Sequence, residues 1–164
     1  MSSVGKLIIV GMADLNVCRG TGGLTTLGLG SCIGIALYDA STKIAGLAHI
    51  MLPDSKQIQN NTNIAKFADT ALVKLIKDME AIGAKKVNMK AKIAGGAQMF
   101  AFNSTNESMK IGQRNTEATV KLLLANRIPL LAQDTGSNFG RTVELYAEDG
   151  RFLIKTIGHG NKVL

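Results

Sequence analysis

The sequence predicts a single α+β domain over residues 1–164. Short apolar runs with strand alternation recur along the chain, and two longer stretches have a helical period. The length is enough to bury one core without disulfides or metal. Because 46% of the residues are hydrophobic and only 4% are aromatic, we expect that core to consist of aliphatic side chains and methionine.

The first segments of the chain are strand-like. Residues 5–13 form an apolar run that ends at Asp14, and residues 15–18 alternate in a way that continues the sheet. Cys18 is not preceded by a glycine-rich segment or followed by an apolar run, which favours a structural role for it.

A glycine-rich stretch from Thr25 to Cys32 then leads into the apolar run Ile33–Tyr38. Small residues beside Cys32 leave room for a carbonyl to approach and backbone N–H groups to receive an oxyanion, which a cysteine nucleophile needs. A glycine-rich turn before a buried strand, with Cys32 as a small apolar side chain, is the simpler interpretation. The local sequence leaves both interpretations open.

Two apolar runs joined by a short polar segment predict a β-hairpin. If residues 33–38 pair antiparallel with residues 44–50 about a turn near Ser41, Cys32 falls opposite position 49 or 50. Cys32 and His49 then share one end of the hairpin, where the imidazole is within reach to act as general base for the thiol. A lone histidine on an apolar strand is more often a hydrogen-bonded core residue, so this alternative also stays open.

Helical and strand patterns alternate over the rest of the chain. The expected elements are a helix over residues 64–82, a strand over 85–94, a helix over 113–127, a strand over 128–132, a turn-rich loop over 134–141, a hairpin of 142–147 and 151–157, and a flexible tail over about 158–164. Gly95 and Gly96 follow a strand without the lysine of a phosphate loop, so we interpret them as a close backbone approach at a groove wall. The loop over 134–141 is able to supply an orienting side chain to a site, and a simple turn is the alternative.

Charge and cysteine content argue against several classes of function. The chain has 19 basic and 12 acidic residues, a net charge of +7, which favours acidic partners. Because the basic residues are dispersed and not interleaved with aromatic side chains, we expect no nucleic-acid binding. Two Cys and two His without a short-spaced pair argue against a metal site, and we expect no cofactor. The few cysteines, and the lack of a signal peptide or an apolar segment of membrane-spanning length, predict a cytoplasmic protein without membrane insertion.

Five blocks of sequence follow one another over nearly the whole chain. They are Leu27–Cys32, Gly46–Ser55, Lys92–Phe100, Ile111–Asn115, and Asp134–Gly136 with Gly140–Thr142. In this order they resemble the CheD family, the chemoreceptor glutamine deamidases of chemotaxis. The chain departs from the family's usual pattern at Ser137, where a second glycine often stands, and at Gln113, where an arginine often precedes another.

The resemblance implies a cysteine-hydrolase fold related to the catalytic domain of cytotoxic necrotizing factor toxins, a mixed β-sandwich flanked by helices. It places the catalytic Cys, His and Thr at Cys32, His49 and Thr26. It implies a protein-glutamine glutaminase that converts glutamines on the cytoplasmic helices of chemoreceptors to glutamate through a Cys32 thioester, and that hydrolyses glutamyl methyl esters by the same route. The spacing itself does not distinguish Thr26 from Thr25.

Four further residues are candidates for the oxyanion hole and the groove. They are Gly30, Ser31, Gly95 and Gly96. The resemblance also implies association with the CheC phosphatase, and regulation through CheC is the alternative main role. A toxin-like deamidase of a protein other than a receptor shares the chemistry and stays open as well.

Overall fold

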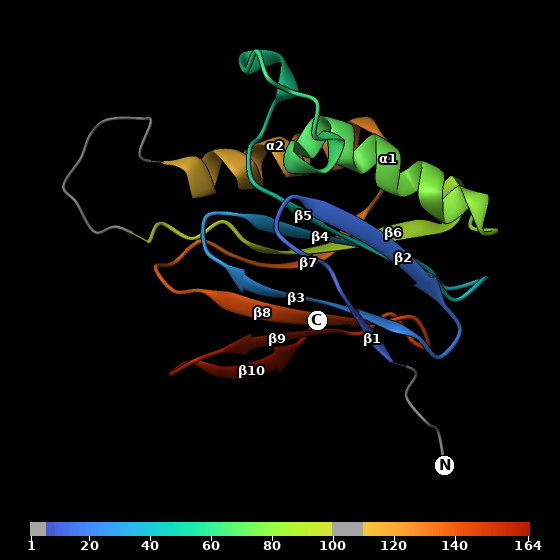
Figure 1. The fold of residues 1–164 in the computed structure, drawn as a ribbon. Coiled ribbons are helices and arrows are strands. Elements are labelled where there is room, and N and C mark those ends of the chain that lie inside the picture. Colours follow the sequence, from blue (N-terminus) through green and yellow to red (C-terminus); the bar gives the residue numbers. More distant parts are fainter. Residues whose placement is uncertain (1–5, 100–109) are drawn as a thin grey trace.

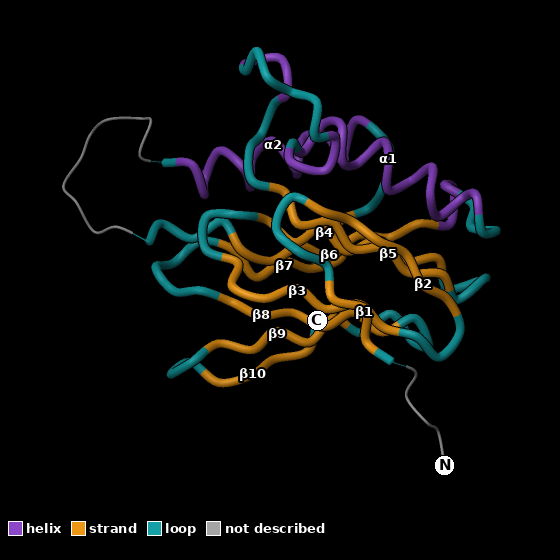
Figure 2. The backbone as a smooth tube through the Cα atoms, in the orientation of Figure 1, coloured by secondary structure: helices purple, strands orange, loops and turns teal. Residues whose placement is uncertain are grey.

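The computed structural model describes residues 6–99 and 110–164, which form three layers (Figure 1). Two five-stranded sheets lie face to face, and both α-helices cover the outer face of one sheet (Figure 2). The strands are β1 (Leu7–Ile9), β2 (Asp14–Arg19), β3 (Gly23–Leu29), β4 (Ile33–Asp39), β5 (Ile44–Ile50), β6 (Met89–Gly95), β7 (Leu130–Thr135), β8 (Arg141–Tyr146), β9 (Phe152–Thr156) and β10 (Gly160–Val163). The helices are α1 (Ala68–Ala81) and α2 (Ile111–Ala125), with short 3₁₀ helices at Ser55–Gln57, Ile64–Lys66 and Lys86–Asn88.

Both sheets are mixed. The helix-covered sheet has the strand order β2-β5-β4-β6-β7, and the second sheet has the order β1-β3-β8-β9-β10. β6 and β7 are parallel, as are β1 and β3, and the other neighbours are antiparallel. The predicted α+β class is confirmed. No helix within the described ranges is both long and apolar enough to cross a membrane.

β4 lies at the centre of the molecule and is buried on both faces. Ile33, Ile35 and Leu37 pack in the core under the helices, whereas Ala36 packs in the core between the two sheets. A strand covered on both sides needs apolar residues in succession, which explains the continuous apolar run in the sequence. Cys32, directly before β4, belongs to the core between the sheets.

The predicted hairpin is present, with a shifted register. Ile33 pairs with Ile50 and Gly34 pairs with His49, so Cys32 lies just beyond the last pair of this ladder. His49 therefore faces Gly34, two residues further along the chain than Cys32. Side chains alternate along a strand, so Cys32 and His49 still share the face between the sheets.

Several other segments differ from the sequence prediction. The first strand is shorter than residues 5–13, and β2 lies in the other sheet instead of continuing that of β1. Residues 64–66 and 86–88 form 3₁₀ helices. The glycine-rich stretch before Cys32 is not a turn but β3, whose pairing with β8 shifts between Thr26 and Leu29, where Gly28 has a φ of +68°. The expected flexible tail contains β10, which pairs with β9. β10 has no apolar pattern to reveal it because all four of its residues are exposed and it is joined to its neighbour through backbone hydrogen bonds. Phe100, the end of one sequence block, lies outside the described residues.

Candidate active site

Residues Gly30–Cys32 link β3 in one sheet to β4 in the other. Their three carbonyl oxygens all accept hydrogen bonds: Gly30 from the N–H of Ala97 at 2.9 Å, Ser31 from Nδ2 of Asn115 at 2.9 Å, and Cys32 from the N–H of Gly96 at 2.8 Å. In contrast, the N–H groups of Ser31 and Cys32 donate to no other residue among those the structure describes. The loop is thus held by its carbonyls and keeps two backbone donors beside the thiol.

Gly95 and Gly96 form a turn against this loop. Gly95 has a φ of +111°, and a Cβ on it would collide with the carbonyl oxygen of Cys32. Only glycine satisfies both the conformation and the close approach. The N–H of Gly96 is already bonded to the carbonyl of Cys32, so this turn supports the backbone of Cys32 and offers no free donor at position 96.

Cys32 is largely buried, with 8% of its surface exposed. Burial raises the pKa of the Cys32 thiol above its ordinary value of 9.0, because the thiolate loses hydration. The residue's own N–H is directed at the sulfur and partly opposes this increase. The resting side chain is therefore a neutral thiol at neutral pH.

His49 comes from β5 and is 1% exposed. Burial lowers the pKa of His49 below its ordinary value of 6.5, because the imidazolium form is poorly solvated there. Because of this lowered pKa, His49 is a neutral imidazole at neutral pH and is able to accept a proton. Gly34, which lies opposite His49 on β4, has no side chain to occupy the shared face beside the ring.

Thr26 fixes the tautomer of that imidazole. Its Oγ1 lies 2.6 Å from the carbonyl oxygen of Val10 and 2.7 Å from Nδ1 of His49. A hydroxyl has one hydrogen and a carbonyl has none, so the hydroxyl donates to Val10 and accepts from His49. Nδ1 therefore bears the proton, and Nε2 keeps its lone pair. Thr25, in contrast, donates to the carbonyl of Val143, so the structure distinguishes the two threonines.

Nε2 of His49 is buried and has no hydrogen-bond partner among the described residues. Leaving such an atom unpaired costs about 1–3 kcal/mol. An unpaired, unprotonated nitrogen on the face that also contains Cys32 is the arrangement expected of a general base before substrate binds. No hydrogen bond joins Nε2 to the Cys32 sulfur in this state.

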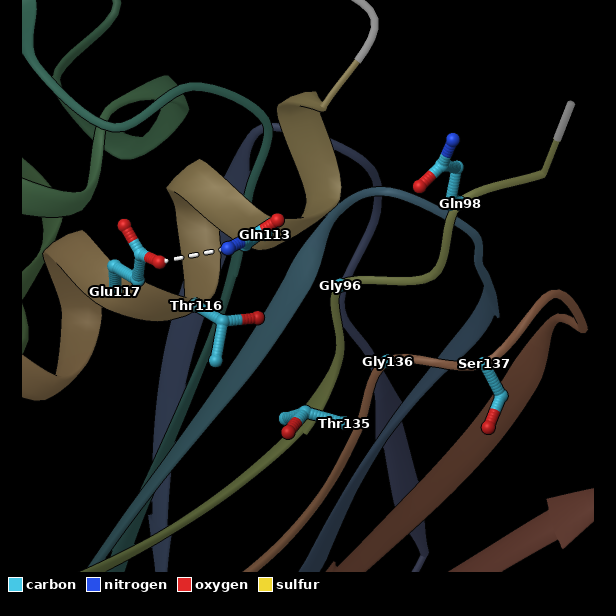
Figure 3. Close-up of a pocket in the computed structure, with 8 residues that line it drawn as sticks. All are labelled: Gly96, Gln98, Gln113, Thr116, Glu117, Thr135, Gly136 and Ser137. Carbon is cyan, nitrogen blue, oxygen red and sulfur yellow. Dashed lines mark hydrogen bonds between the residues drawn. The ribbon is translucent and has the colours of Figure 1, made fainter. Parts of the chain in front are cut away.

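A pocket of about 410 Å³, lined by polar residues and glycines, opens beside the Gly95–Gly96 turn (Figure 3). Helix α2 forms one wall with Gln113, Thr116 and Glu117, and the other wall is formed by Gly96, Gln98 and residues 135–137. Nε2 of Gln113 donates to Glu117 at 3.0 Å, as the dashed line shows. Gly96 both lines the pocket and contacts the backbone of Cys32, so the pocket adjoins the candidate nucleophile.

The other Cys and His have different environments. Burial raises the pKa of Cys18 to about 11, which makes it a poor nucleophile. The ring of His159 stacks on Phe139, with 4.0 Å between ring centroids. Within the described ranges, no group of three or more His, Cys, Asp or Glu side chains is arranged to hold a metal.

Two residues at the site were not singled out as site residues from the sequence. Asn115 of α2 is fully buried and contacts the Cys32 loop, and Arg141 of β8 donates to the carbonyl of Gly95. A signal existed for Asn115: asparagine is a poor helix former, yet it shares a helical face with Thr119 and Leu123, both buried. Arg141 gave no such signal, because a basic residue at the start of a strand is usually exposed.

Comparison with known proteins agrees with the resemblance seen in the sequence. The model of the family described as "CheD chemotactic sensory transduction" matches residues 51–156. A protein named probable chemoreceptor glutamine deamidase CheD from Lachnoclostridium phytofermentans is 54% identical over 159 residues, covering 97% of this chain and 99% of that protein. The protein of that name from Caldanaerobacter subterraneus is 53% identical, covering 97% and 98% respectively. The chemoreceptor glutamine deamidase CheD of Halalkalibacterium halodurans is also 53% identical, covering 95% and 97%.

Among solved structures, the crystal structure of the Bacillus licheniformis hypothetical protein YfiH matches with a TM-score of 0.44 and 13% identity. It covers 74% of this chain and 50% of that chain.

Proposed function

The chain belongs to the CheD family, and from this premise we propose that it is a chemoreceptor glutamine deamidase, a protein-glutamine glutaminase with Cys32 as its nucleophile. The proposal gives His49 the role of general base and Thr26 that of the residue that orients it. The observation that carries these roles is the pairing of Thr26 with Nδ1, which leaves Nε2 as a buried acceptor without a partner.

The first half of the reaction forms a thioester. As the substrate carboxamide enters, His49 Nε2 takes the proton of the Cys32 thiol, and the sulfur forms a bond to the carboxamide carbon. The carbonyl oxygen becomes an oxyanion, for which the N–H groups of Ser31 and Cys32 are the available donors. His49 then returns its proton to the amide nitrogen, the carbon–nitrogen bond breaks, and ammonia leaves.

The second half releases glutamate. His49 accepts a proton from water as the hydroxyl oxygen attacks the thioester carbon, and the same two N–H groups hold the second oxyanion. The carbon–sulfur bond breaks, the sulfur regains the proton from His49, and the product is the γ-carboxyl group of glutamate. A glutamyl methyl ester follows the same steps with methanol as the leaving group.

The polar pocket beside Gly96 supports a protein substrate. Its walls present amide and hydroxyl groups from Gln98, Gln113, Thr116 and Thr135, which suit the polar side chains that flank a glutamine on a receptor helix. We place the cytoplasmic helices of chemoreceptors across this pocket, with the target glutamine reaching Cys32. This substrate, in turn, places the enzyme in the cytoplasm.

The same proposal includes a relationship to a known toxin fold and an association with CheC. The mixed sandwich, with a cysteine at the crossing between its sheets, supports a cysteine-hydrolase fold like that of the cytotoxic necrotizing factor catalytic domain. The family membership supports association with CheC, whose docking near the pocket would compete with the receptor. If CheC regulation is the main role, Cys32→Ala retains it in full.

Mass spectrometry of a chemoreceptor cytoplasmic fragment tests the proposed function. Incubation with the wild-type protein is expected to add about 1 Da at specific glutamines, with a thioester trapped on Cys32 and no conversion by Cys32→Ala. Cys18→Ala is the matched control, because Cys18 is a buried cysteine outside the site, and it is expected to retain activity. Full conversion by Cys32→Ala, or a thioester on Cys18, would overturn the assignment, and tight CheC binding without any conversion would favour the regulatory role.

A further inference from the structure

Asn115 lies where β4, which begins directly after Cys32, and β5, which contains His49, stop pairing with each other. The β4–β5 ladder ends at Ile33 and Ile50, and the next residues diverge. The N–H of Met51 leaves the ladder to bond the carbonyl of Lys66 at 2.8 Å. Beyond this point no backbone bond among the described residues ties the Cys32 loop to the end of β5.

The Asn115 side chain bridges this gap. Its Nδ2 donates one hydrogen to the carbonyl of Ser31 and the other to the carbonyl of Met51, both at 2.9 Å. Ser31 directly precedes the nucleophile, and Met51 follows His49 by two residues. The amide group thus replaces the missing rung of the ladder, between the segment that carries the nucleophile and the segment that carries the base.

We propose that Asn115 is a positioning residue that sets the spacing of Cys32 and His49 through these two carbonyls. The proposal deepens the proposed function and rests on it. Thr26 fixes the imidazole from the opposite sheet, and Asn115 fixes the thiol's loop relative to the same strand. Both are required because the thiol and Nε2 must meet in one geometry when substrate arrives.

The rest of the Asn115 amide supports this interpretation. Its Oδ1 is buried without a hydrogen-bond partner among the described residues, which is unfavourable for stability. Two carbonyls can only accept, so the amide cannot turn over to satisfy Oδ1 without losing both donated bonds. The side chain is therefore held there by its two donors.

Helix α2 packs tightly enough against the turn beside Cys32 to hold the Asn115 side chain in place. A Cβ on Gly112 would collide with the backbone of Gly96 and Ala97, so the first turn of α2 lies directly against the turn that holds Cys32. The Asn115 side chain, about one helical turn beyond Gly112, thus projects from a backbone that is fixed against the Cys32 loop.

The test compares Asn115→Ala and Asn115→Leu with Thr119→Val. Asn115→Leu keeps about the size of the side chain and buries no charge, so it serves where the cavity left by Asn115→Ala prevents folding. Thr119→Val removes a fully buried hydroxyl that bonds within α2, one helical turn away, without touching either carbonyl. Two quantities are measured well below each variant's Tm: the steady-state deamidation of a receptor fragment, and the rate of Cys32 alkylation by iodoacetamide, read by mass spectrometry.

Both Asn115 variants are expected to lose about 10–100-fold in kcat with KM changed less than about threefold, because the groove is intact and only the alignment of the reacting groups is lost. The Cys32 alkylation rate shifts at least about threefold from wild type, and Thr119→Val resembles wild type in both measurements. Folded Asn115 variants with wild-type kcat and alkylation, or a Thr119→Val loss of equal size, would overturn the proposal. If the wild-type protein deamidates nothing, the proposed function is refuted instead. The Cys32 alkylation rates of the wild type and the Asn115 variants then still show whether Asn115 positions the thiol.

Discussion

The hydroxyl oxygen of Thr26 lies 2.7 Å from Nδ1 of His49, and the two residues come from opposite sheets of the sandwich. The same hydroxyl is oriented by the carbonyl of Val10, so a chain of two hydrogen bonds selects the protonated nitrogen of the imidazole. The two sheets therefore have to be packed face to face before the imidazole has this tautomer. In the proposed mechanism, catalysis thus depends on correct packing of the sandwich core.

Replacing Thr26 by Val removes the acceptor for Nδ1–H while keeping the size of the side chain. We expect kcat to fall by about 10²–10⁴-fold, because the imidazole loses its orientation and tautomer. Thr26→Ser keeps the hydroxyl and is expected to retain most activity. Thr25→Val is the matched control, since the hydroxyl of Thr25 donates to the carbonyl of Val143 and not to His49. Deamidation by Thr25→Val at the level of Thr26→Val would contradict the role given to Thr26.

The reactivity of Cys32 is expected to depend steeply on pH. Its pKa is raised by burial above 9.0, and the pKa of His49 is lowered by burial, so the free enzyme contains a neutral thiol and a neutral imidazole. The rate of Cys32 alkylation by iodoacetamide then rises about tenfold per pH unit from pH 7 toward pH 9, since only the thiolate reacts. A rate that is already constant between pH 6 and pH 8 would show a preformed thiolate–imidazolium pair and contradict this prediction.

His49 is expected to make the protein less stable in acid. Its folded pKa lies below the 6.5 of the unfolded chain, so the unfolded state binds the extra proton first. The free energy of unfolding therefore falls as the pH drops below about 6.5, by at most ~1.4 kcal/mol per pH unit from this one group. Urea denaturation of the wild type and His49→Gln at several pH values between 5 and 8 measures this, and an equal slope in both proteins would rule out His49 as the source.

Gly95→Ala is expected to abolish deamidation and to destabilise the fold. A Cβ at this position collides with the carbonyl of Cys32, and the φ of +111° is unfavourable for alanine. Gly20→Ala is the matched control, because Gly20 also has a positive φ, of +71°, but no atom within 4 Å of a Cβ. It should cost only the conformational strain of about 1–2 kcal/mol and leave kcat unchanged. Thermal unfolding and the deamidation assay separate the two effects.

The part of the candidate site on the β4–β5 hairpin could be predicted from the local sequence pattern. Alternation of apolar residues and a short polar turn are enough to predict the β4–β5 hairpin, and with it the presence of Cys32 and His49 at one end. The register was off by one residue because the connection consists of residues 40–43 and is centred between Ser41 and Thr42, not on Ser41. Cys32 itself lies just beyond the ladder, where the chain crosses between the sheets. Pairing rules do not apply to such a crossing.

The other half of the site depends on packing between distant segments. Thr26 reaches His49 from the opposite sheet, and Asn115 reaches the Cys32 loop from a helix more than eighty residues later. Neither contact has a sequence spacing that identifies it. β3 itself was missed because its glycines, including Gly28 at the bulge, are typical of a turn in sequence.

Arg141 links the loop after β7 to the Gly95–Gly96 turn that lies against Cys32. The residue is 2% exposed. Its Nε donates to Asp134 at 3.0 Å, and its Nη1 donates to the carbonyls of Gly136 at 3.0 Å and Gly95 at 3.3 Å. The planar guanidinium reaches all three acceptors at once, which a single ammonium group does not. Arg141→Lys thus keeps the charge beside Asp134 but releases the carbonyl of Gly95.

We expect Arg141→Lys to lower the free energy of unfolding by about 1–3 kcal/mol, because buried carbonyls lose their donors. It also lowers kcat, since the released turn no longer holds the carbonyl of Cys32 in place. Arg151→Lys is the matched control, because Arg151 pairs with Asp149 at 2.7 Å on the surface. There the substitution is expected to change the free energy of unfolding by less than about 1 kcal/mol. Urea denaturation and the deamidation assay measure both variants, and an Arg141→Lys protein that matches Arg151→Lys in stability and kcat would show that the guanidinium has no part in supporting the site.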